Sequence, residues 1–197
     1  PAWFKRWQAE YGETPPCPVP RSPHNATDLI IEAIRAHPGQ VTLLALGPLT
    51  NLALAVRLAP DIVDKVHAVV TMGGSFGQQE PIPEFNARCD PEAAHIVLTA
   101  GWPLRLLGLN ITRQMLFLRA DFERLPAAHP ALNLLRRQAP GWIDRVEAEG
   151  WESGGCSLHD AVAVAALLDE RLFEWRETAV SVDLHHPESR GVTLFGN

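Results

Sequence analysis

Three short, almost uninterrupted apolar runs separated by helical stretches constrain the fold of this 197-residue chain most strongly. The runs are residues 41–46, 67–72 and 104–109, with the sequences VTLLAL, HAVVTM and LRLLGL. A strand that is apolar at successive positions is buried on both faces, which is typical of a parallel sheet. Parallel neighbours need a crossover connection, usually a helix. The alternation therefore predicts an α/β fold built on a parallel sheet.

Apolar residues at helical spacing predict the helices that connect these strands. The predicted helices are residues 25–37, 50–58, a helix that begins at 91, most of 113–150, and 157–168. Asp90 is expected to cap the third of these, with Pro91 at its first helical position, where the missing N–H costs nothing. Near the C-terminus, residues 178–184 and 191–195 are expected to form an antiparallel pair of strands at one edge.

Charge and composition exclude several classes of partner. The chain has 17 Lys and Arg against 23 Asp and Glu, a formal net charge of −6, and no basic cluster longer than Arg136-Arg137. Nucleic acid is therefore not expected as the primary partner. No apolar run reaches the ~20 residues that a membrane-spanning helix needs. The three cysteines fall into no disulfide or zinc pattern, so a reducing cytoplasm is the expected location.

The two ends of the sequence suggest a part of something longer. Residue 1 is Pro, and an alternating apolar pattern is still running where the chain stops, over residues 191–197. We expect a single partial domain over residues 1–197. Within it, residues 12–24 are rich in proline, which predicts an extended surface segment.

Polar residues that follow the predicted strands are the candidates for a binding site, because open parallel sheets bind ligands beyond the carboxyl ends of their strands. These segments are residues 47–51, 73–86 and 110–112. The second begins with paired glycines, which allow a close backbone approach. It ends with Glu84 and Asn86, two residues apart and expected on one side of an extended segment. A carboxylate and an amide so placed are suited to binding a polyol.

Each candidate also has an ordinary structural explanation. Glycines after a strand are usually only a turn, and Glu84 and Asn86 could be solvated loop residues. Asp160 could be the N3 residue of a capping box whose N-cap is Ser157, and His159 could lie on the surface of the first helical turn. Taken singly, each residue is better explained by structure than by function.

Taken together, six segments resemble one family, the inosine-uridine preferring nucleoside hydrolases. The segments, in the order found in that family, are NATDLIIEAIR from Asn25, LALGPLTNLAL from Leu44, VTMGGSFG from Val70, PEFNARCDPEAA from Pro83, GLNITRQ from Gly108 and LHDAVAVA from Leu158. They cover nearly the whole chain. The resemblance implies an open, mostly parallel sheet with helices on both faces and a Rossmann-like core, truncated at the N-terminus.

The resemblance also implies an activity and roles for named residues. The family hydrolyses the N-glycosidic bond of ribonucleosides to ribose and free base, with a calcium ion that assists the attacking water. The backbone carbonyl of Leu46 and the carboxylate of Asp160 match two calcium ligands. Glu84 and Asn86, with Asp160, match ribose-binding residues, and His159 matches a histidine that protonates the leaving base. A homodimer or homotetramer and a place in purine or pyrimidine salvage are also implied.

The chemistry explains these residue types. Cleavage passes through an oxocarbenium-like sugar, so the site needs carboxylates near the sugar, an activated water and a proton for the base. Calcium takes six to eight oxygen ligands and can bind sugar hydroxyls and the water together.

The sequence departs from the family pattern in several places. The Asp-x-Asp-Pro-Gly-x-Asp-Asp stretch and the His-Gly-x-x-Gly-Leu-Gly segment are absent, and Asp61 and Asp64 lie on the wrong side of the Gly-Pro-Leu-Thr-Asn turn to replace the former. A loop asparagine is not at a matched position, where Gln78 or Gln79 could serve. We therefore expect impaired hydrolysis by this chain.

Three explanations are consistent with these departures. The chain could be a fragment of a complete hydrolase, a non-catalytic nucleoside-binding or interaction module, or a remnant kept for oligomerisation. In the last case exposed Trp3, Phe4 and Trp7 would need a partner surface. The sequence leaves the preference for purine or pyrimidine bases open.

Overall fold

The structure, a computed structural model, describes residues 5, 9, 19–77 and 82–196. The chain divides into two compact units, one of residues 1–23 and 117–156 and the other of residues 24–116 and 157–197. The second unit contains the parallel sheet and the candidate residues Leu46, Glu84, Asn86, His159 and Asp160. Gln78 and Gln79 lie outside the described residues.

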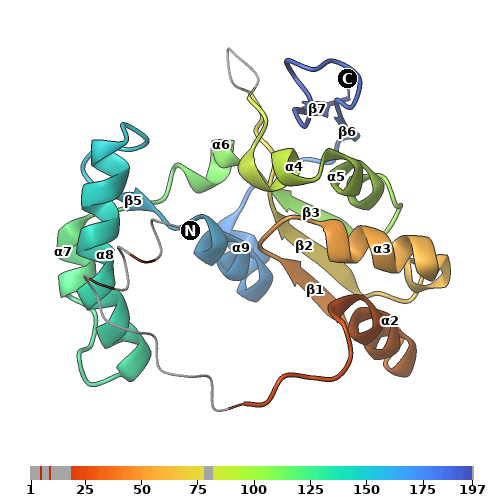
Figure 1. The fold of residues 1–197 in the computed structure, drawn as a ribbon, viewed down its shortest axis with the longest axis horizontal. Helices are drawn as coiled ribbons and strands as arrows, with labels where there is room; N and C mark the ends of the chain where they lie inside the picture. The colour runs from red at the N-terminus through yellow and green to blue at the C-terminus, as the bar shows by residue number, and fades with distance from the viewer. Residues whose placement is uncertain (1–4, 6–8, 10–18, 78–81, 197) are drawn as a thin grey trace. The chain divides into compact units, whose positions relative to one another are not determined.

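A three-stranded parallel sheet forms the frame of the second unit (Figure 1). Its strands are β1 (Thr42–Ala45), β2 (Ala68–Met72) and β3 (Leu104–Leu107), in the order β1-β2-β3. Thr42 lies opposite Ala68, and Val69 lies opposite Leu104. The parallel sheet is thus confirmed. The third strand is two residues shorter than predicted, because Leu109 begins helix α6 (Leu109–Thr112).

Helices cover both faces of the sheet, as predicted. One face packs against α2 (Ala26–Ala36), α3 (Thr50–Leu58) and α5 (Pro91–Leu98), and the other packs against α9 (His159–Leu168). Successive side chains of a strand point to opposite faces. Accordingly, Val69 belongs to the apolar cluster on the first face and Val70 to the cluster on the second. Both are completely buried, which explains why β2 is apolar at successive positions.

Local capping sets the starts of two helices where the sequence predicts them. The Asn25 side chain accepts a hydrogen bond from the Asp28 N–H, 2.9 Å long, at the start of α2. The Asp90 side chain accepts one of 3.0 Å from the Ala93 N–H at the start of α5, where Pro91 is the first helical residue. Asp90 also accepts a 2.6 Å hydrogen bond from the Thr50 hydroxyl, so this cap joins α5 to the start of α3.

The predicted capping box at Ser157 is wrong. Ser157 lies in the short strand β5 (Cys156–Ser157), which pairs with β4 (Leu116–Phe117). Because Ser157 is held in a strand, α9 begins only at His159, with Leu158 at the capping position and no side-chain capping bond. Asp160 is therefore the second helical residue, in the first turn of α9, where the helix dipole favours a negative charge.

The remaining predicted elements are found near their expected places. Strands β6 (Val180–Val182) and β7 (Thr193–Phe195) form an antiparallel pair, as predicted, but in a two-stranded sheet of their own rather than at an edge of the parallel sheet. Residues 113–150 are largely helical, with α7 (Arg119–Glu123) and α8 (Pro130–Ala148). The shorter helices are α4 (Phe85–Cys89) and the 3-10 turns η1 (Pro60–Ile62) and η2 (Glu170–Leu172).

The structure describes only part of the N-terminal region for which the sequence makes predictions. Of the proline-rich segment, residues 19–24 form neither helix nor strand, and residues 12–18 lie outside the described residues. Trp3, Phe4 and Trp7 lie outside them as well. Among the described helices, none is both long and apolar enough to cross a membrane.

Helix α2 offers a test of the packing on the first face of the sheet. Ile34 is completely buried, whereas Leu29 on the same helix is 40% exposed. We expect Ile34→Ala to lower the free energy of unfolding by about 2–5 kcal/mol, because a cavity remains in the core. Leu29→Ala should cost much less. Urea unfolding followed by circular dichroism measures both, and equal losses would contradict the assigned packing.

Candidate functional site

The site lies beyond the carboxyl ends of the three parallel strands (Figure 1). Leu46 follows β1, the glycine loop of residues 73–77 follows β2, and α6 follows β3. Gly73 N–H donates a 3.1 Å hydrogen bond to the Leu107 carbonyl, and Leu109 N–H donates one of 2.9 Å to the Gly74 carbonyl. These two bonds hold the ends of β2 and β3 together beyond the last paired residues.

Glu84 is a buried carboxylate held by backbone N–H groups. Its side chain is 4% exposed and caps α4. Oε2 accepts hydrogen bonds from Gly74 N–H (3.2 Å), Asn86 N–H (2.9 Å) and Ala87 N–H (3.1 Å), and Oε1 accepts a second, 2.9 Å bond from Asn86 N–H. The carboxylate therefore joins the glycine loop to the first turn of α4.

The predicted extended conformation of residues 84–86 is wrong. Glu84 has extended backbone angles, but Asn86 is the second residue of α4. The carboxylate of Glu84 satisfies N–H groups in the first turn of α4, and this starts a helix. The Asn86 side chain is also buried, and its Nδ2 donates to the Met72 carbonyl over 3.2 Å. Asn86 is thus bound to the end of β2, and its placement beside Glu84 results from a helical turn rather than from a strand.

His159 and Asp160 occupy the start of α9. His159 Nδ1 lies 2.7 Å from the hydroxyl of Thr112, the last residue of α6, and Thr112 is completely buried. This bond orients the imidazole ring. Asp160 is exposed, yet partial loss of water contact raises the pKa of its carboxyl above the ordinary value, and the neighbouring His159 partly offsets that rise.

The contact between Thr112 and His159 is not predicted from the sequence. The segment Asn110-Ile-Thr112 is a candidate because it follows a predicted strand and belongs to one of the six resembling segments. Its threonine hydroxyl meets a histidine 47 positions later in the chain. Position after a strand was the available signal, whereas the partner could not be inferred from spacing.

The predicted calcium ligands do not make a complete metal site. Within residues 19–77 and 82–196, no group of three or more His, Cys, Asp or Glu side chains is placed to hold a metal. The Leu46 carbonyl and the Asp160 carboxylate would supply two kinds of oxygen ligand, whereas calcium takes six to eight. These residues alone do not fit the ion.

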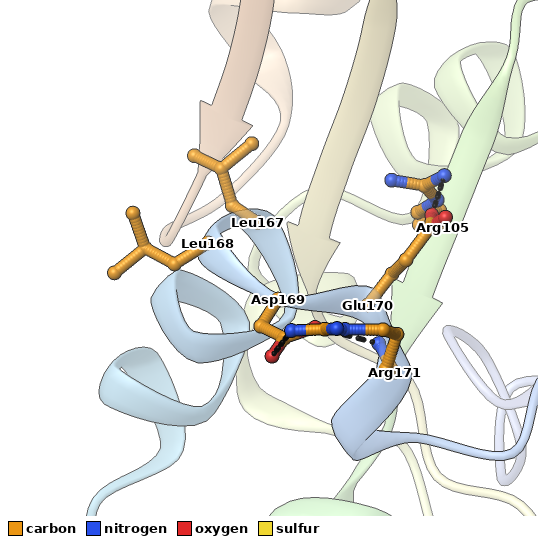
Figure 2. Close-up of a pocket in the computed structure, with 6 residues that line it drawn as sticks. All are labelled: Arg105, Leu167, Leu168, Asp169, Glu170 and Arg171. Carbon is orange, nitrogen blue, oxygen red and sulfur yellow. Dashed lines mark hydrogen bonds and ion pairs between the residues drawn. The ribbon is translucent and has the colours of Figure 1, made fainter.

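A separate hollow of about 430 Å³ lies at the other end of α9 (Figure 2). Its charged residues pair with one another: Arg171 binds Asp169 over 2.8 Å, and Arg105 binds Glu170. Asp169 follows Asp160 by nine residues, or about 13 Å along a helix at 1.5 Å per residue. The hollow is therefore distinct from the strand-end site, and its charges are already neutralised.

Comparison with known proteins identifies the family. The family model of the inosine-uridine preferring nucleoside hydrolases matches residues 7–197. The chain belongs to this family. An inosine-uridine preferring nucleoside hydrolase of Leishmania major is 37% identical over 175 residues, which are 86% of this chain and 55% of the relative. A pyrimidine-specific ribonucleoside hydrolase of Enterobacter sp. (strain 638), RihA, is 34% identical over 172 residues, with the same coverage of 86% and 55%.

Solved structures agree with this nucleoside hydrolase assignment. A purine-preferring ribonucleoside hydrolase from Gardnerella vaginalis superimposes with a TM-score of 0.86 at 30% identity, over 93% of this chain and 59% of that one. A plant nucleoside hydrolase gives a TM-score of 0.82 at 32% identity, over 94% and 60%. The chain thus spans a little over half the length of the relatives that it matches.

Glu84 provides a test of the strand-end geometry. In Glu84→Gln, an NH₂ donor replaces an oxygen that accepts backbone N–H groups, and buried donors lose their acceptor. We expect the free energy of unfolding to fall by about 1–3 kcal/mol. Urea unfolding of the variant measures this change.

Glu92→Gln is the matched control, because Glu92 is exposed and pairs with Arg190. Exposed ion pairs contribute little, so the control should unfold nearly as the unchanged protein does. A Glu84→Gln variant that unfolds at the same urea concentration as the control would contradict the capping role.

Proposed function

We propose that this chain contributes to hydrolysis of the N-glycosidic bond of ribonucleosides, giving ribose and free base. The observation that carries the proposal is the placement of Asn86 and His159 beyond the carboxyl ends of two adjacent parallel strands. Asn86 is bound to the end of β2 through Met72, and α6, which follows β3, binds His159 through Thr112, in a member of the nucleoside hydrolase family. A sugar-binding pair and a proton donor on ends of adjacent parallel strands are the parts that this reaction needs.

His159 is proposed to protonate the leaving base. In the reaction, the oxygen of water forms a bond to the anomeric carbon of ribose and gives up one proton to the solvent, while the bond from that carbon to the base nitrogen breaks and the base leaves with its electron pair. A proton given to the base neutralises the charge that develops there. Because Thr112 binds Nδ1, the ring orientation is fixed and the proton comes from Nε2.

Glu84, Asn86 and Asp160 are proposed to bind ribose hydroxyls. A carboxylate oxygen has two lone-pair positions, and among the described residues Oε1 of Glu84 accepts a bond from one backbone group, Asn86 N–H. The other position is suited to a sugar hydroxyl. The raised pKa of the Asp160 carboxyl, caused by its loss of water contact, means that a hydroxyl donor or a cation would restore an interaction that water supplies elsewhere.

We propose that hydrolysis by this chain is slow. Leu46 and Asp160 remain the proposed calcium ligands, but calcium needs more oxygens than they provide. Because too few oxygens hold the ion that would assist the attacking water, the rate should lie well below that of a longer relative such as the Leishmania major hydrolase. The roles given above for His159, Glu84 and Asn86 do not depend on the ion.

The proposal extends to the substrate class, the oligomeric state, the cellular location and the partners of the protein. The substrate is a nucleoside, and the names of the relatives include both pyrimidine-specific and purine-preferring hydrolases, so they favour neither kind of base. A homodimer or homotetramer in the cytoplasm, serving nucleoside salvage, is proposed. With a net charge of −6, neither nucleic acid nor an anionic membrane surface is proposed as a partner.

Ribose release tests the proposal. The full chain is incubated with inosine and with uridine, and free ribose is measured as reducing sugar, with the Leishmania major hydrolase as the positive control. We expect slow release above the protein-free background. His159→Ala should reduce the release by about 10²-fold or more, because general acid catalysis typically contributes that much.

His37→Ala is the matched control, because His37 is exposed and ends α2 away from the strand ends. It should leave ribose release unchanged. Equal release by the His159 variant and the unchanged chain would refute the role of His159. Binding of inosine without any ribose release would replace hydrolysis by non-catalytic nucleoside binding.

A further inference from the structure

The β6–β7 hairpin holds the glycine loop through one threonine side chain. Ser75 N–H donates a 2.9 Å hydrogen bond to Thr193 Oγ1, and the Thr193 hydroxyl lies 3.3 Å from the Ser75 carbonyl, to which it donates. The two residues are 118 positions apart. Thr193 is 3% exposed and Ser75 is 2% exposed. A single hydroxyl therefore satisfies both backbone groups of Ser75 in a buried place.

The packing around Gly74 shows how closely the hairpin approaches the loop. Gly74 has a φ of +78°, and a Cβ atom there would lie 2.9 Å from Thr193 Oγ1 and 3.0 Å from the Phe76 ring. The Phe76 ring in turn stacks on Phe195, with centroids 4.0 Å apart and planes 12° apart. The loop backbone thus lies directly against the hairpin.

The hairpin also contacts the helices that follow the loop. Gly191, between β6 and β7, lies close to the backbone of α4: a Cβ atom there would be 3.1 Å from the Arg88 Cα. Arg190 forms an ion pair with Glu92 in the first turn of α5. The hairpin therefore contacts the chain on both sides of Glu84, before it in the loop and after it in α4 and α5.

We propose that Thr193 is a positioning residue for the ribose-binding segment. Its hydroxyl fixes the backbone of Ser75, and hence that of Gly74, whose N–H donates to the Glu84 carboxylate over 3.2 Å. Without that hydroxyl, Ser75 N–H is buried with no acceptor, the loop opens, and Glu84 loses one of its three N–H donors. The proposal rests on the proposed function for its effect on ribose, but its effect on the loop does not.

Three variants of the full chain test this role. Thr193→Val keeps a similar shape and removes the hydroxyl, whereas Thr193→Ser keeps the hydroxyl. Thr178→Val is the matched control, because the Thr178 hydroxyl bonds to Ala179 and Gly196 carbonyls rather than to the glycine loop. Amide hydrogen exchange of Gly74 and Ser75 is measured by NMR, with the buried Val70 amide as the internal reference. Ribose binding is measured by calorimetry on the same samples.

In Thr193→Val, we expect Gly74 and Ser75 to exchange at least about fivefold faster, with Val70 unchanged, because one hydrogen bond is lost. Ribose affinity should fall by a similar factor. Thr193→Ser should restore both measurements, and Thr178→Val should change neither. Restoration by serine separates the hydroxyl's role from general packing.

The two measurements distinguish failure of this inference from failure of the proposed function. If Gly74 and Ser75 exchange equally in Thr193→Val and in the unchanged chain, the positioning role is refuted. If exchange accelerates and ribose binds the unchanged chain and Thr193→Val equally well, positioning of a ribose site is refuted. If exchange accelerates and the unchanged chain binds no ribose, the ribose site of the proposed function is refuted while Thr193 still holds the loop.

Discussion

The geometry of the strand-end site depends on one buried carboxylate, which backbone N–H groups of the described residues bind. The Glu84 carboxylate joins the loop after β2 to the first turn of α4, and this turn also contains Asn86. No cationic side chain bonds to it in the described part of the chain, so the N–H groups of Gly74, Asn86 and Ala87 alone offset its loss of water. Such an arrangement tolerates little movement, because each N–H must stay within hydrogen-bond distance. The same contacts that fold this segment therefore also place its polar side chains.

Several parts of the fold follow directly from local sequence. The cap at Asp90 with Pro91 needs only residues 90–93, and the strands of the parallel sheet are marked by three almost uninterrupted apolar runs of six residues each. The predictions that proved wrong failed because contacts between distant parts of the sequence override local spacing. Ser157 satisfies the spacing of a capping box, but pairing with β4 places it in a strand. Glu84 and Asn86 have the spacing of an extended pair, but the Glu84 carboxylate accepts hydrogen bonds from Asn86 and Ala87 N–H and so caps a helix. The same carboxylate also accepts one from Gly74 N–H, ten positions upstream.

In the candidate site, too, some residues could be found from the sequence and others depend on distant contacts. Position after a predicted strand made Glu84 and Asn86 candidates, whereas His159 and Asp160 became candidates only through the resemblance to the nucleoside hydrolases. The residues that hold them in place were not found. Thr112 and Thr193 act on partners 47 and 118 positions away, and threonine in an apolar segment is ordinary in strands and helix ends. Sequence patterns thus indicate which groups perform chemistry better than they indicate which groups hold them.

The bond between Thr112 and His159 has a consequence for how this chain can vary. It joins the two ends of the segment 113–158, which contains α7 and α8. The entropy cost of closing a flexible connection grows only with the logarithm of its length, so doubling it adds only about 0.6 kcal/mol. Residues 126–129, between α7 and α8, are exposed, so insertions at this connection are expected to cost the strand-end site little. A hydrolase of this architecture can change the size of that excursion while its proton donor stays in place.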